Sequence, residues 1–289
     1  MARHIMLNGN IMPSDTPCLS YDNRGLLWGD SFSVQLRGNS CFVYDFSSYF
    51  ACISRIAESM GMQAEESFSA KSFANDISLL LKKNRIYKEF VATITIFRNS
   101  NSTNKIASTN TFSTLVSVES LPHEHYSINK EGIFTDIFDA SQLPCPTTNT
   151  YFRYELVSGN IMAEKAVDDL IITDTDGNYR RSLHSDIFFM KDKSLIYASN
   201  YEKTSINSVF SSRIMQLAKQ KLGMEIYKSP INNSKLKSVD AMFLADPVNG
   251  IRWVVGMGRN RFYSGIVNDI AYEIYHYYKT EIENLKSIL

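Results

Sequence analysis

The order of strand-like and helix-like segments constrains the fold of this chain more than any other feature of its sequence. Runs of β-branched and aromatic residues outnumber segments of helical periodicity and do not alternate with them one for one. A doubly wound parallel sheet needs that alternation, so an α+β fold is expected instead. The strand patterns fall at residues 5–7, 11–12, 32–36, 41–44, 90–97, 111–118, 133–138, 170–173, 187–190, 195–197 and 241–245, with a further hairpin over 251–262.

Several segments carry apolar residues at helical spacing. Helices are predicted over residues 47–60, 70–84, 151–166 and 206–222, followed by a long C-terminal helix. Gly223 suits the position just after a helix, because only glycine takes a positive φ freely. The last helix is expected to bury a stripe formed by Ile266, Ile270, Ile274, Tyr277 and Leu285.

The length of 289 residues accommodates two subdomains, and the chain changes character at residues 121–125. Leu121-Pro122 ends the first group of strands and helices, and a second group begins near Ile133. We therefore expect an N-terminal α+β subdomain at 1–120, a linker at 121–131 and a C-terminal α+β subdomain at 132–289.

Composition and charge exclude several classes of protein. Basic and acidic residues number 30 each, so the formal net charge is zero, which argues against a protein that mainly grips nucleic acid or an anionic membrane. The sequence has no run of 18 apolar residues and no secretory signal pattern at its start, so a cytoplasmic protein is expected. The four cysteines, Cys18, Cys41, Cys52 and Cys145, are widely spaced and are expected to be free thiols.

Three short motifs suggest chemistry but are better explained as ordinary structure. His123-Glu124-His125 offers metal donors, yet a third ligand is missing nearby, so a connecting loop is the preferred interpretation. Residues 174–178 lack the first and last ligands of a calcium loop and predict a β-turn. Gly256-Met257-Gly258 opens no helix and predicts a hairpin turn. No metal site is expected.

From Arg24-Gly25 through Gly29-Asp30 to Phe32, the chain resembles the class IV aminotransferases. This family includes branched-chain aminotransferases, D-amino acid aminotransferases and aminodeoxychorismate lyases. The resemblance extends over about 250 residues through motifs in the family's order, at Leu7-Asn8-Gly9, Ser54-Arg55-Ile56, Met60-Gly61-Met62, Ile171-Ile172-Thr173-Asp174, Asp186-Ile187-Phe188-Phe189 and Asn249-Gly250-Ile251-Arg252-Trp253-Val254. It implies the family's two-subdomain fold with a cleft between the subdomains, pyridoxal phosphate (PLP) as cofactor, a small-molecule ligand and a homodimer.

The family's lysine, which holds PLP as an internal aldimine, has no counterpart in this sequence. The matching position is Thr147 or Thr148, and residues 139–163 contain no lysine. Arg153 lies in this stretch, but its guanidinium pKa is too high for aldimine formation. Lys165 would lie at the far end of the following helix, roughly 20 Å away at 1.5 Å per residue.

Other positions of the family's cofactor site are partly kept. The resemblance implies that Arg55 and the amides of Val209 and Phe210, at the start of a helix, bind the phosphate. The family's threonine on the opposite side corresponds to Pro247, which has neither a hydroxyl nor an N–H. Arg181 occupies the position of the glutamate that keeps the pyridine nitrogen protonated, and a cation there would disfavour that protonation.

Two functional hypotheses follow. The chain is a working PLP-dependent aminotransferase or lyase, as the resemblance implies, or it is a degenerate member that binds a small ligand or a protein partner without aldimine chemistry. The missing lysine favours the second. A third hypothesis, a cofactor-independent enzyme, would draw on Tyr151, Arg153 and His184. No nucleic-acid or membrane partner is expected.

Overall fold

The contacts in a computed structural model of the chain divide it into two units. Unit 1 comprises Met1–His125 and Lys203–Val209, and unit 2 comprises Tyr126–Glu202 and Phe210–Leu289. The first boundary between the units, after His125, lies within residues 121–131, where a linker was expected. A short later segment, Lys203–Val209, also belongs to unit 1. The structure describes residues 3–64, 68–99, 109–122, 126–127, 131–138, 161–174, 176–197, 207–263 and 265–286.

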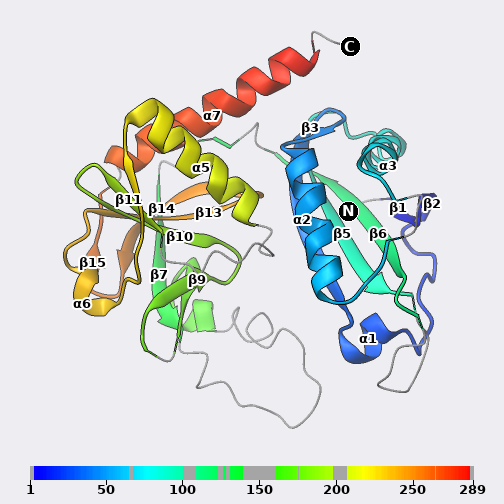
Figure 1. The fold of residues 1–289 in the computed structure, drawn as a ribbon, viewed down its shortest axis with the longest axis horizontal. Coiled ribbons are helices and arrows are strands. Elements are labelled where there is room, and N and C mark those ends of the chain that lie inside the picture. The colour runs from blue at the N-terminus through cyan, green and yellow to red at the C-terminus, as the bar shows by residue number, and fades with distance from the viewer. Residues whose placement is uncertain are drawn as a thin grey trace. The chain divides into compact units, whose positions relative to one another are not determined.

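Unit 1 is built on one antiparallel sheet of six strands (Figure 1). Its order is β2-β1-β6-β5-β3-β4. The strands are β1 (His4–Leu7), β2 (Asn10–Pro13), β3 (Ser31–Asn39), β4 (Phe42–Val43), β5 (Glu89–Arg98) and β6 (Phe112–Ser120). Asn8 and Gly9 both have positive φ, so the β1–β2 hairpin turns at the predicted Asn-Gly pair.

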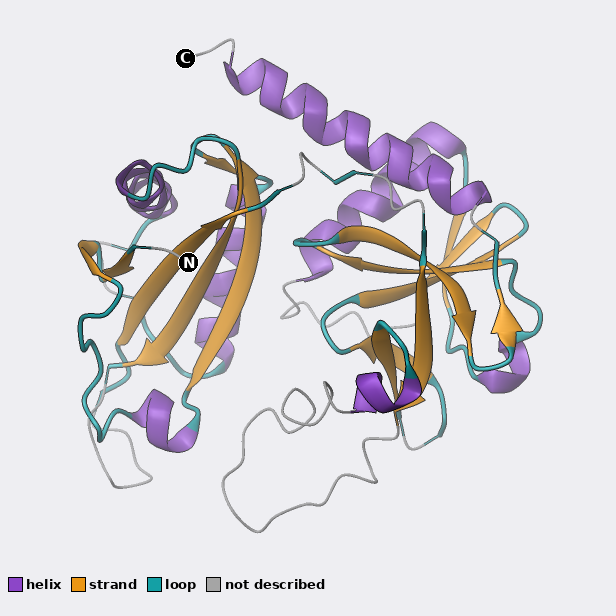
Figure 2. Ribbon diagram, turned by 180° about the vertical axis from the view of Figure 1, so that it is seen from behind, coloured by secondary structure: helices purple, strands orange, loops and turns teal. Residues whose placement is uncertain are grey.

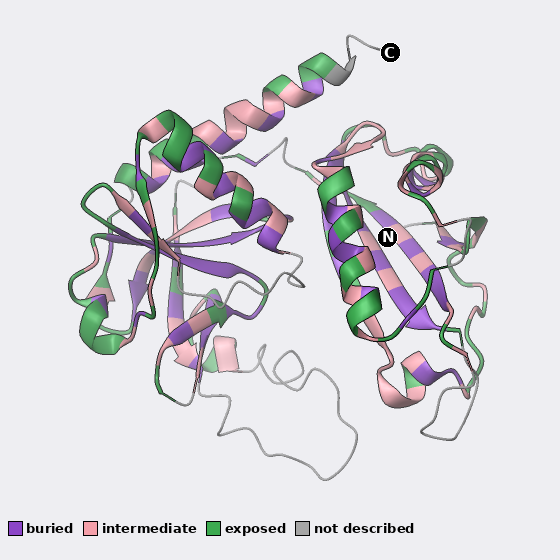
Figure 3. Cartoon of the chain, in the orientation of Figure 1, coloured by how far each residue is buried: buried purple, intermediate pink, exposed green. Residues whose placement is uncertain are grey.

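The helices α2 (Phe46–Ser59) and α3 (Ala70–Lys83) pack on one face of this sheet. Both are amphipathic, and their buried residues join those of β3, β5 and β6 in a single core. Figure 3 shows the exposed residues along the outer side of α2. The other face of the sheet is polar: Ser33 hydrogen-bonds Thr95, and Gln35 donates to Thr93.

The motif from Arg24 to Asp30 has a structural role in unit 1. It forms the short helix α1 (Arg24–Trp28), capped at its start by Asn23. Asp30 pairs with Arg24 at 3.0 Å and with Arg98 at 2.8 Å. Burial opposes ionisation of Asp30, but the hydrogen bonds and charges of the two arginines together hold its pKa below the ordinary value. Arg98 also donates to Met60 O and Gly61 O, which end α2.

Unit 2 contains a mixed sheet of nine strands. Eight of them follow the order β12-β11-β10-β13-β14-β7-β8-β9, and β15 pairs with β14. The strands are β7 (Ile133–Phe138), β8 (Asp169–Thr173), β9 (Tyr179–Ser182), β10 (Asp186–Lys191), β11 (Ser194–Tyr197), β12 (Glu225–Lys228), β13 (Ala241–Asp246), β14 (Gly250–Met257) and β15 (Asn260–Arg261). The parallel pairs are β14–β7, β7–β8 and β11–β12.

The long helices of unit 2 are α5 (Asn207–Leu222) and α7 (Gly265–Lys286), which Figure 2 shows beside the strands, and a short α6 (Asn233–Leu236) precedes β13. Residues 161–165 are also helical, within the predicted helix 151–166, whose earlier residues lie outside the described ones. The strand core includes Phe188 stacked on Phe243 at 5.0 Å between ring centroids. Among the described residues, no helix is long and apolar enough to span a bilayer.

The predicted α+β architecture is confirmed, and the buried stripe of the C-terminal helix needs a correction. Ile266 is 38% exposed, whereas its neighbour Val267 is 1% exposed, and Tyr277 is only half-buried. The buried residues of α7 are Val267, Ile270, Ala271, Ile274, Tyr278 and Ile282. They recur every three or four positions, as on one face of a helix. The buried residue is therefore Val267 where the prediction named Ile266, and Tyr278 where it named Tyr277. Leu285 lies outside the residues whose burial is described.

Short elements were missed, one predicted turn is confirmed and the other is shifted. No strand was predicted at β9 or β12 and no helix at α1 or α6, because each is too short to show a period. Asp174 Oδ1 accepts from the N–H groups of Asp176 and Asn178, which forms the predicted turn. The predicted hairpin is present, but Gly256 and Met257 still belong to β14 and pair with Arg261 and Asn260, so its turn lies at residues 258–259. The segment His123–His125 lies outside the described residues.

Candidate functional site

Arg55 is the residue of α2 that the sequence links to phosphate binding. It is exposed, next to the face that buries Cys52, Ile53 and Ala57. In the part of the chain that the structure describes, Arg55 forms no ion pair with Glu58 or Asp45, the two acidic neighbours that would compete for it. Its guanidinium is thus available to an anion from solution.

The first turn of α5 carries Ser208, Val209 and Phe210. The first N–H groups of a helix lack partners within the helix, and the helix dipole favours an anion at this end. The side chain of Val209 packs against the core of unit 1, whereas Phe210 is buried in unit 2. The helix therefore begins where the sequence predicts, with the three residues in its first turn.

Tyr126 brings the first turn of α5 close to Pro247 within unit 2. Its ring centroid lies 4.9 Å from that of Phe210, and its hydroxyl donates to Pro247 O at 2.8 Å. Gly250 has a φ of +72°, and a Cβ there would lie 2.6 Å from Cδ1 of Tyr126. Only glycine lets Tyr126 pack this closely. Two of the segments that the sequence links to phosphate binding are therefore neighbours.

The turn that contains Pro247 uses its own backbone donors. Asp246 Oδ1 accepts from Val248 N at 2.9 Å and from Asn249 N at 2.7 Å, and Asn249 Nδ2 donates to the same carboxylate. Proline has no N–H. The three consecutive residues after Asp246 therefore offer an anion little from their backbone, and the Pro247 side chain has no hydroxyl to add.

Arg181, at the position linked to the cofactor ring, lies in β9. Its Nη1 donates to Ser182 O at 3.2 Å and to Leu183 O at 2.6 Å. The guanidinium is thus held against the turn between β9 and β10. Its neighbour Arg180 pairs with Asp174 at 2.6 Å. A positive charge is accordingly held at the end of β9, at the position that the resemblance links to the pyridine nitrogen.

A buried polar network joins the β9–β10 turn to the Asp246 turn. Arg252 Nη2 donates to Asp169 Oδ2 at 2.6 Å and to Ser185 Oγ at 3.0 Å, and Ser185 Oγ donates to Asp246 Oδ2 at 2.7 Å. Ser182 Oγ also reaches Asp169, at 3.3 Å. The carboxylates and serines are buried, so the network fixes both turns in a water-poor environment.

A second buried contact ties β10 to α5. Ser211 Oγ donates to Asp186 Oδ2 at 2.7 Å, one residue after Phe210 and at the first residue of β10. Asp186 and Arg252 belong to motifs of the family resemblance, but their contacts were not predicted. Tyr126, Asp169, Ser185 and Ser211 were missed altogether. No signal of local periodicity marks them, because each acts through a partner distant in sequence.

Lys165, one of the two lysines nearest in sequence to positions 147 and 148, is already engaged, and the other, Lys130, lies outside the described residues. Lys165 Nζ lies 2.6 Å from Asp136 Oδ2 and also donates to Ile137 O at 3.3 Å. Thr147, Thr148, Tyr151 and Arg153 lie outside the described residues. Among the described residues, no group of three or more His, Cys, Asp or Glu is arranged to hold a metal ion.

The sequence model of the amino-transferase class IV family matches residues 51–256 of the chain. The match covers well over half of the sequence and includes Arg55, Arg181, Val209, Phe210 and Pro247. The chain therefore belongs to the aminotransferase class IV family, and the predicted resemblance is confirmed. Among curated proteins, no sequence match is found.

Solved structures share the fold along nearly the whole chain. A branched-chain aminotransferase from Thermoproteus uzoniensis with norvaline has a TM-score of 0.78 at 14% identity, covering 95% of this chain and 94% of that one. The branched-chain amino acid aminotransferase from Thermobaculum terrenum in its PLP-bound holo form has a TM-score of 0.75 at 12% identity, covering 94% and 92%. A putative 4-amino-4-deoxychorismate lyase from Legionella pneumophila has a TM-score of 0.75 at 15% identity, covering 90% and 95%.

Proposed function

We propose that this protein is a degenerate member of the aminotransferase class IV family that binds an anionic small molecule, with a phosphate or carboxylate group, and forms no internal aldimine with PLP. The observation that carries the proposal is the absence of lysine from residues 139–163, where the family places its aldimine lysine. Non-catalytic binding of a protein partner is the alternative for the same surface.

The residues present do not fit PLP as a covalent cofactor. Of the two lysines nearest in sequence to positions 147 and 148, Lys165 is paired with Asp136, and Lys130 lies outside the described residues. At the position of the pyridine-nitrogen partner, the guanidinium of Arg181 would disfavour protonation of the ring nitrogen and so weaken the ring as an electron sink. Three separate parts of the family's chemistry are thus changed together: the amine at 147 or 148, the carboxylate at 181 and the threonine at 247.

The features that remain are those of an anion site. Arg55 supplies a cation without an acidic partner among the described residues, and the first turn of α5 supplies N–H groups at the positive end of a helix dipole. Both are suited to a phosphate or carboxylate. Because Pro247 contributes no donor and Asp246 occupies the following amides, we expect the affinity to be weak.

Treatment with PLP followed by borohydride is expected to give no stoichiometric pyridoxyl adduct on any single lysine. Peptide mapping by mass spectrometry measures the adduct at each lysine, and wild type is compared with Lys165→Ala. We expect the two proteins to show the same low, scattered labelling of surface lysines. One fully labelled lysine in the wild type would overturn the proposal, and its loss in Lys165→Ala would identify Lys165 as that lysine.

Inorganic phosphate is expected to raise the melting temperature of the wild type, and Arg55→Ala is expected to remove this shift. Loss of one charge-assisted contact lowers the affinity for phosphate by about tenfold. A dissociation constant in the millimolar range then rises above that range, and the thermal shift disappears. Lys82→Ala removes another exposed cation, from α3, and serves as the control, with the shift retained. Equal melting curves for the wild type with and without phosphate would mean that the anion site has been lost.

A homodimer and a cytoplasmic location are part of the same proposal. The family resemblance supports the dimer, and the sequence adds 16 tyrosines and 11 methionines, because Tyr and Met are enriched at protein interfaces. Both stay predictions.

A further inference from the structure

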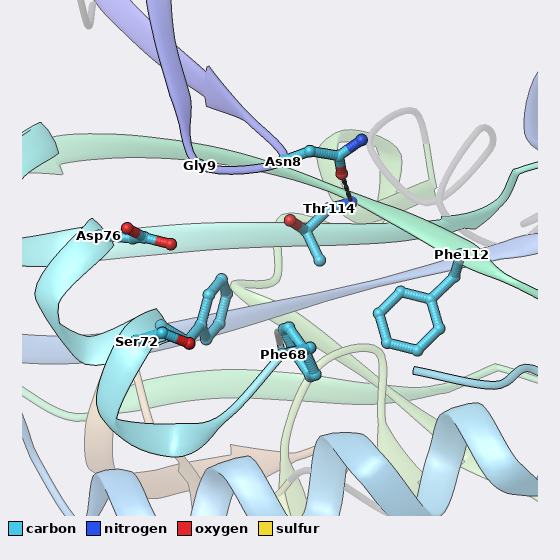
Figure 4. A pocket seen from close by; sticks show the side chains of 8 residues that line it. Asn8, Gly9, Phe68, Ser72, Asp76, Phe112 and Thr114 are labelled. Atoms are coloured by element: carbon cyan, nitrogen blue, oxygen red, sulfur yellow. Dashed lines mark hydrogen bonds between the residues drawn. The ribbon is translucent and has the colours of Figure 1, made fainter. Parts of the chain in front are cut away.

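A cavity of about 230 Å³ lies in unit 1 between α3, β6 and the turn of the β1–β2 hairpin. Figure 4 shows Asp76 and Ser72 on neighbouring turns of α3, Asn8 and Thr114 across the cavity from them, and Phe68 and Phe112 farther along the same space. The remaining lining residues are Gly9 and Phe73. None of these residues belongs to the anion site described above.

Asp76 is the charged group of this cavity. In the described part of the chain, its carboxylate has no hydrogen-bond or ion-pair partner, although the residue is half-buried. Burial raises the pKa of the Asp76 carboxyl above its ordinary value. A carboxylate held in this way costs stability at neutral pH, because the folded state binds the proton more tightly than the unfolded state does.

The polar neighbours of Asp76 have other partners. Asn8 Oδ1 accepts from Thr114 N at 2.8 Å, and Asn8 Nδ2 donates to Ser113 Oγ at 3.1 Å. Ser72 Oγ donates to Ser69 O at 3.0 Å as part of the cap of α3. Among the described residues that face the cavity, none therefore donates a hydrogen bond to the Asp76 carboxylate. This carboxylate can accept hydrogen bonds from a ligand or from water.

Aromatic rings form the apolar part of the cavity wall. The ring of Phe68 lies 5.1 Å from that of Phe73 and 5.2 Å from that of Phe112, with the second pair edge to face. Aromatic faces attract a cation through the ring quadrupole and also pack against apolar groups. The cavity thus combines one anionic group with a cluster of three phenylalanines.

We propose that this cavity binds a small organic cation, an ammonium group attached to an apolar body. The ammonium pairs with the Asp76 carboxylate, and the apolar body packs against Phe68, Phe73 and Phe112. Bare Ca²⁺ would find only one carboxylate here, whereas it takes about six to eight oxygen ligands. The cavity is smaller than the roughly 300–1,000 Å³ of sites for drug-sized molecules, so a single-ring amine is the appropriate size.

Benzylamine and benzyl alcohol form a matched pair of probes, because they share a ring and differ in charge. Titration calorimetry and ligand-observed NMR are expected to show benzylamine binding with a dissociation constant on the order of 1 mM, and benzyl alcohol binding about tenfold more weakly. Asp76→Asn is expected to weaken benzylamine about tenfold and to leave benzyl alcohol unchanged. Asp15→Asn, which removes an exposed carboxylate from a turn of unit 1, should leave both affinities unchanged.

Two further measurements separate recognition from a structural role. Asp76→Asn is expected to raise the melting temperature at pH 7, whereas a carboxylate that stabilises the fold would lower it on removal. Asp76→Glu is expected to keep the preference for benzylamine, because the charge remains in the cavity. Equal affinity for the two probes in the wild type, undiminished benzylamine binding by Asp76→Asn, or no binding at about 10-fold above the expected dissociation constant would each overturn the proposal. The phosphate response of Arg55 is independent of all these outcomes.

Discussion

Replacement of Arg37 with methionine is expected to lower the free energy of unfolding of unit 1 by about 3–5 kcal/mol. Arg37 Nε lies 2.7 Å from Glu89 Oε2, and the side chains are 6% and 1% exposed. The other oxygen of Glu89 accepts from Asn39 Nδ2 and from the hydroxyl of Tyr44. Without Arg37, the Glu89 carboxylate stays buried and accepts hydrogen bonds from neutral donors only. The cost of this desolvated, unpaired charge accounts for the lower free energy of unfolding.

The two tryptophans of the chain, Trp28 in unit 1 and Trp253 in unit 2, allow each unit to be followed separately by fluorescence. Urea unfolding of Arg37→Met is measured in a Trp253→Phe background, where Trp28 reports on unit 1. The double variant Arg37→Met/Glu89→Gln removes both charges and is expected to recover most of the lost stability.

The exposed pair Lys165–Asp136 provides the control for Arg37. Its N–O distance is 2.6 Å, as short as that of the buried pair, but the side chains are 40% and 31% exposed. Lys165→Met, followed by Trp253 in a Trp28→Phe background, is therefore expected to cost less than about 1 kcal/mol. Similar losses for Arg37→Met and Lys165→Met would contradict the argument that burial makes the difference.

Local patterns in the sequence were sufficient for most elements of the fold. The helices α2 and α3 were predicted because their apolar residues recur at helical spacing, and the turn at Asn8-Gly9 because both residues tolerate positive φ. The stripe of α7 was misplaced because several aromatic and aliphatic residues flank it. Tyr277 packs under the guanidinium of Arg213, 4.3 Å from its ring, instead of in the strand core.

The candidate site was only partly predictable, because its parts are joined by contacts between distant residues. The family resemblance located Arg55, Arg181 and Pro247 in the sequence. It could not indicate that Tyr126 would reach Pro247 O across 121 positions, or that Arg252 would reach Asp169 across 83. Such contacts depend on strand order, which periodicity does not reveal. In the sheet, β14, β7 and β8 lie side by side in that order, and this pairing brings Arg252 within reach of Asp169.

Replacement of Arg252 with methionine is expected to lower the free energy of unfolding of unit 2 by about 3 kcal/mol, the low end of the range for a broken buried ion pair. Its side chain is 19% exposed, so water offsets part of the loss. Arg252 lies 2.6 Å from Asp169 and 3.9 Å from Asp246, and without it the two buried carboxylates repel each other with only hydroxyl and amide donors between them.

Trp253 fluorescence in a Trp28→Phe background measures this loss, and hydrogen exchange of the Val248 and Asn249 amides measures its local effect. Both amides donate to Asp246, so faster exchange is expected as the turn loosens. Arg180→Met is the control, because it breaks the more exposed pair with Asp174 and should cost clearly less than Arg252→Met.

The network makes a further prediction about energetic coupling. Asp169→Asn combined with Arg252→Met removes one negative and one positive charge, so the double variant should be less destabilised than the sum of the two single variants. The Ser185 hydroxyl would still bridge to Asp246, which keeps the β9–β10 turn next to the Pro247 turn. Two results would contradict this prediction: additive losses of unfolding free energy in the double variant, or unchanged hydrogen exchange of the Val248 amide in Arg252→Met. Either result would mean that packing alone holds the two turns and that the buried charges are not coupled.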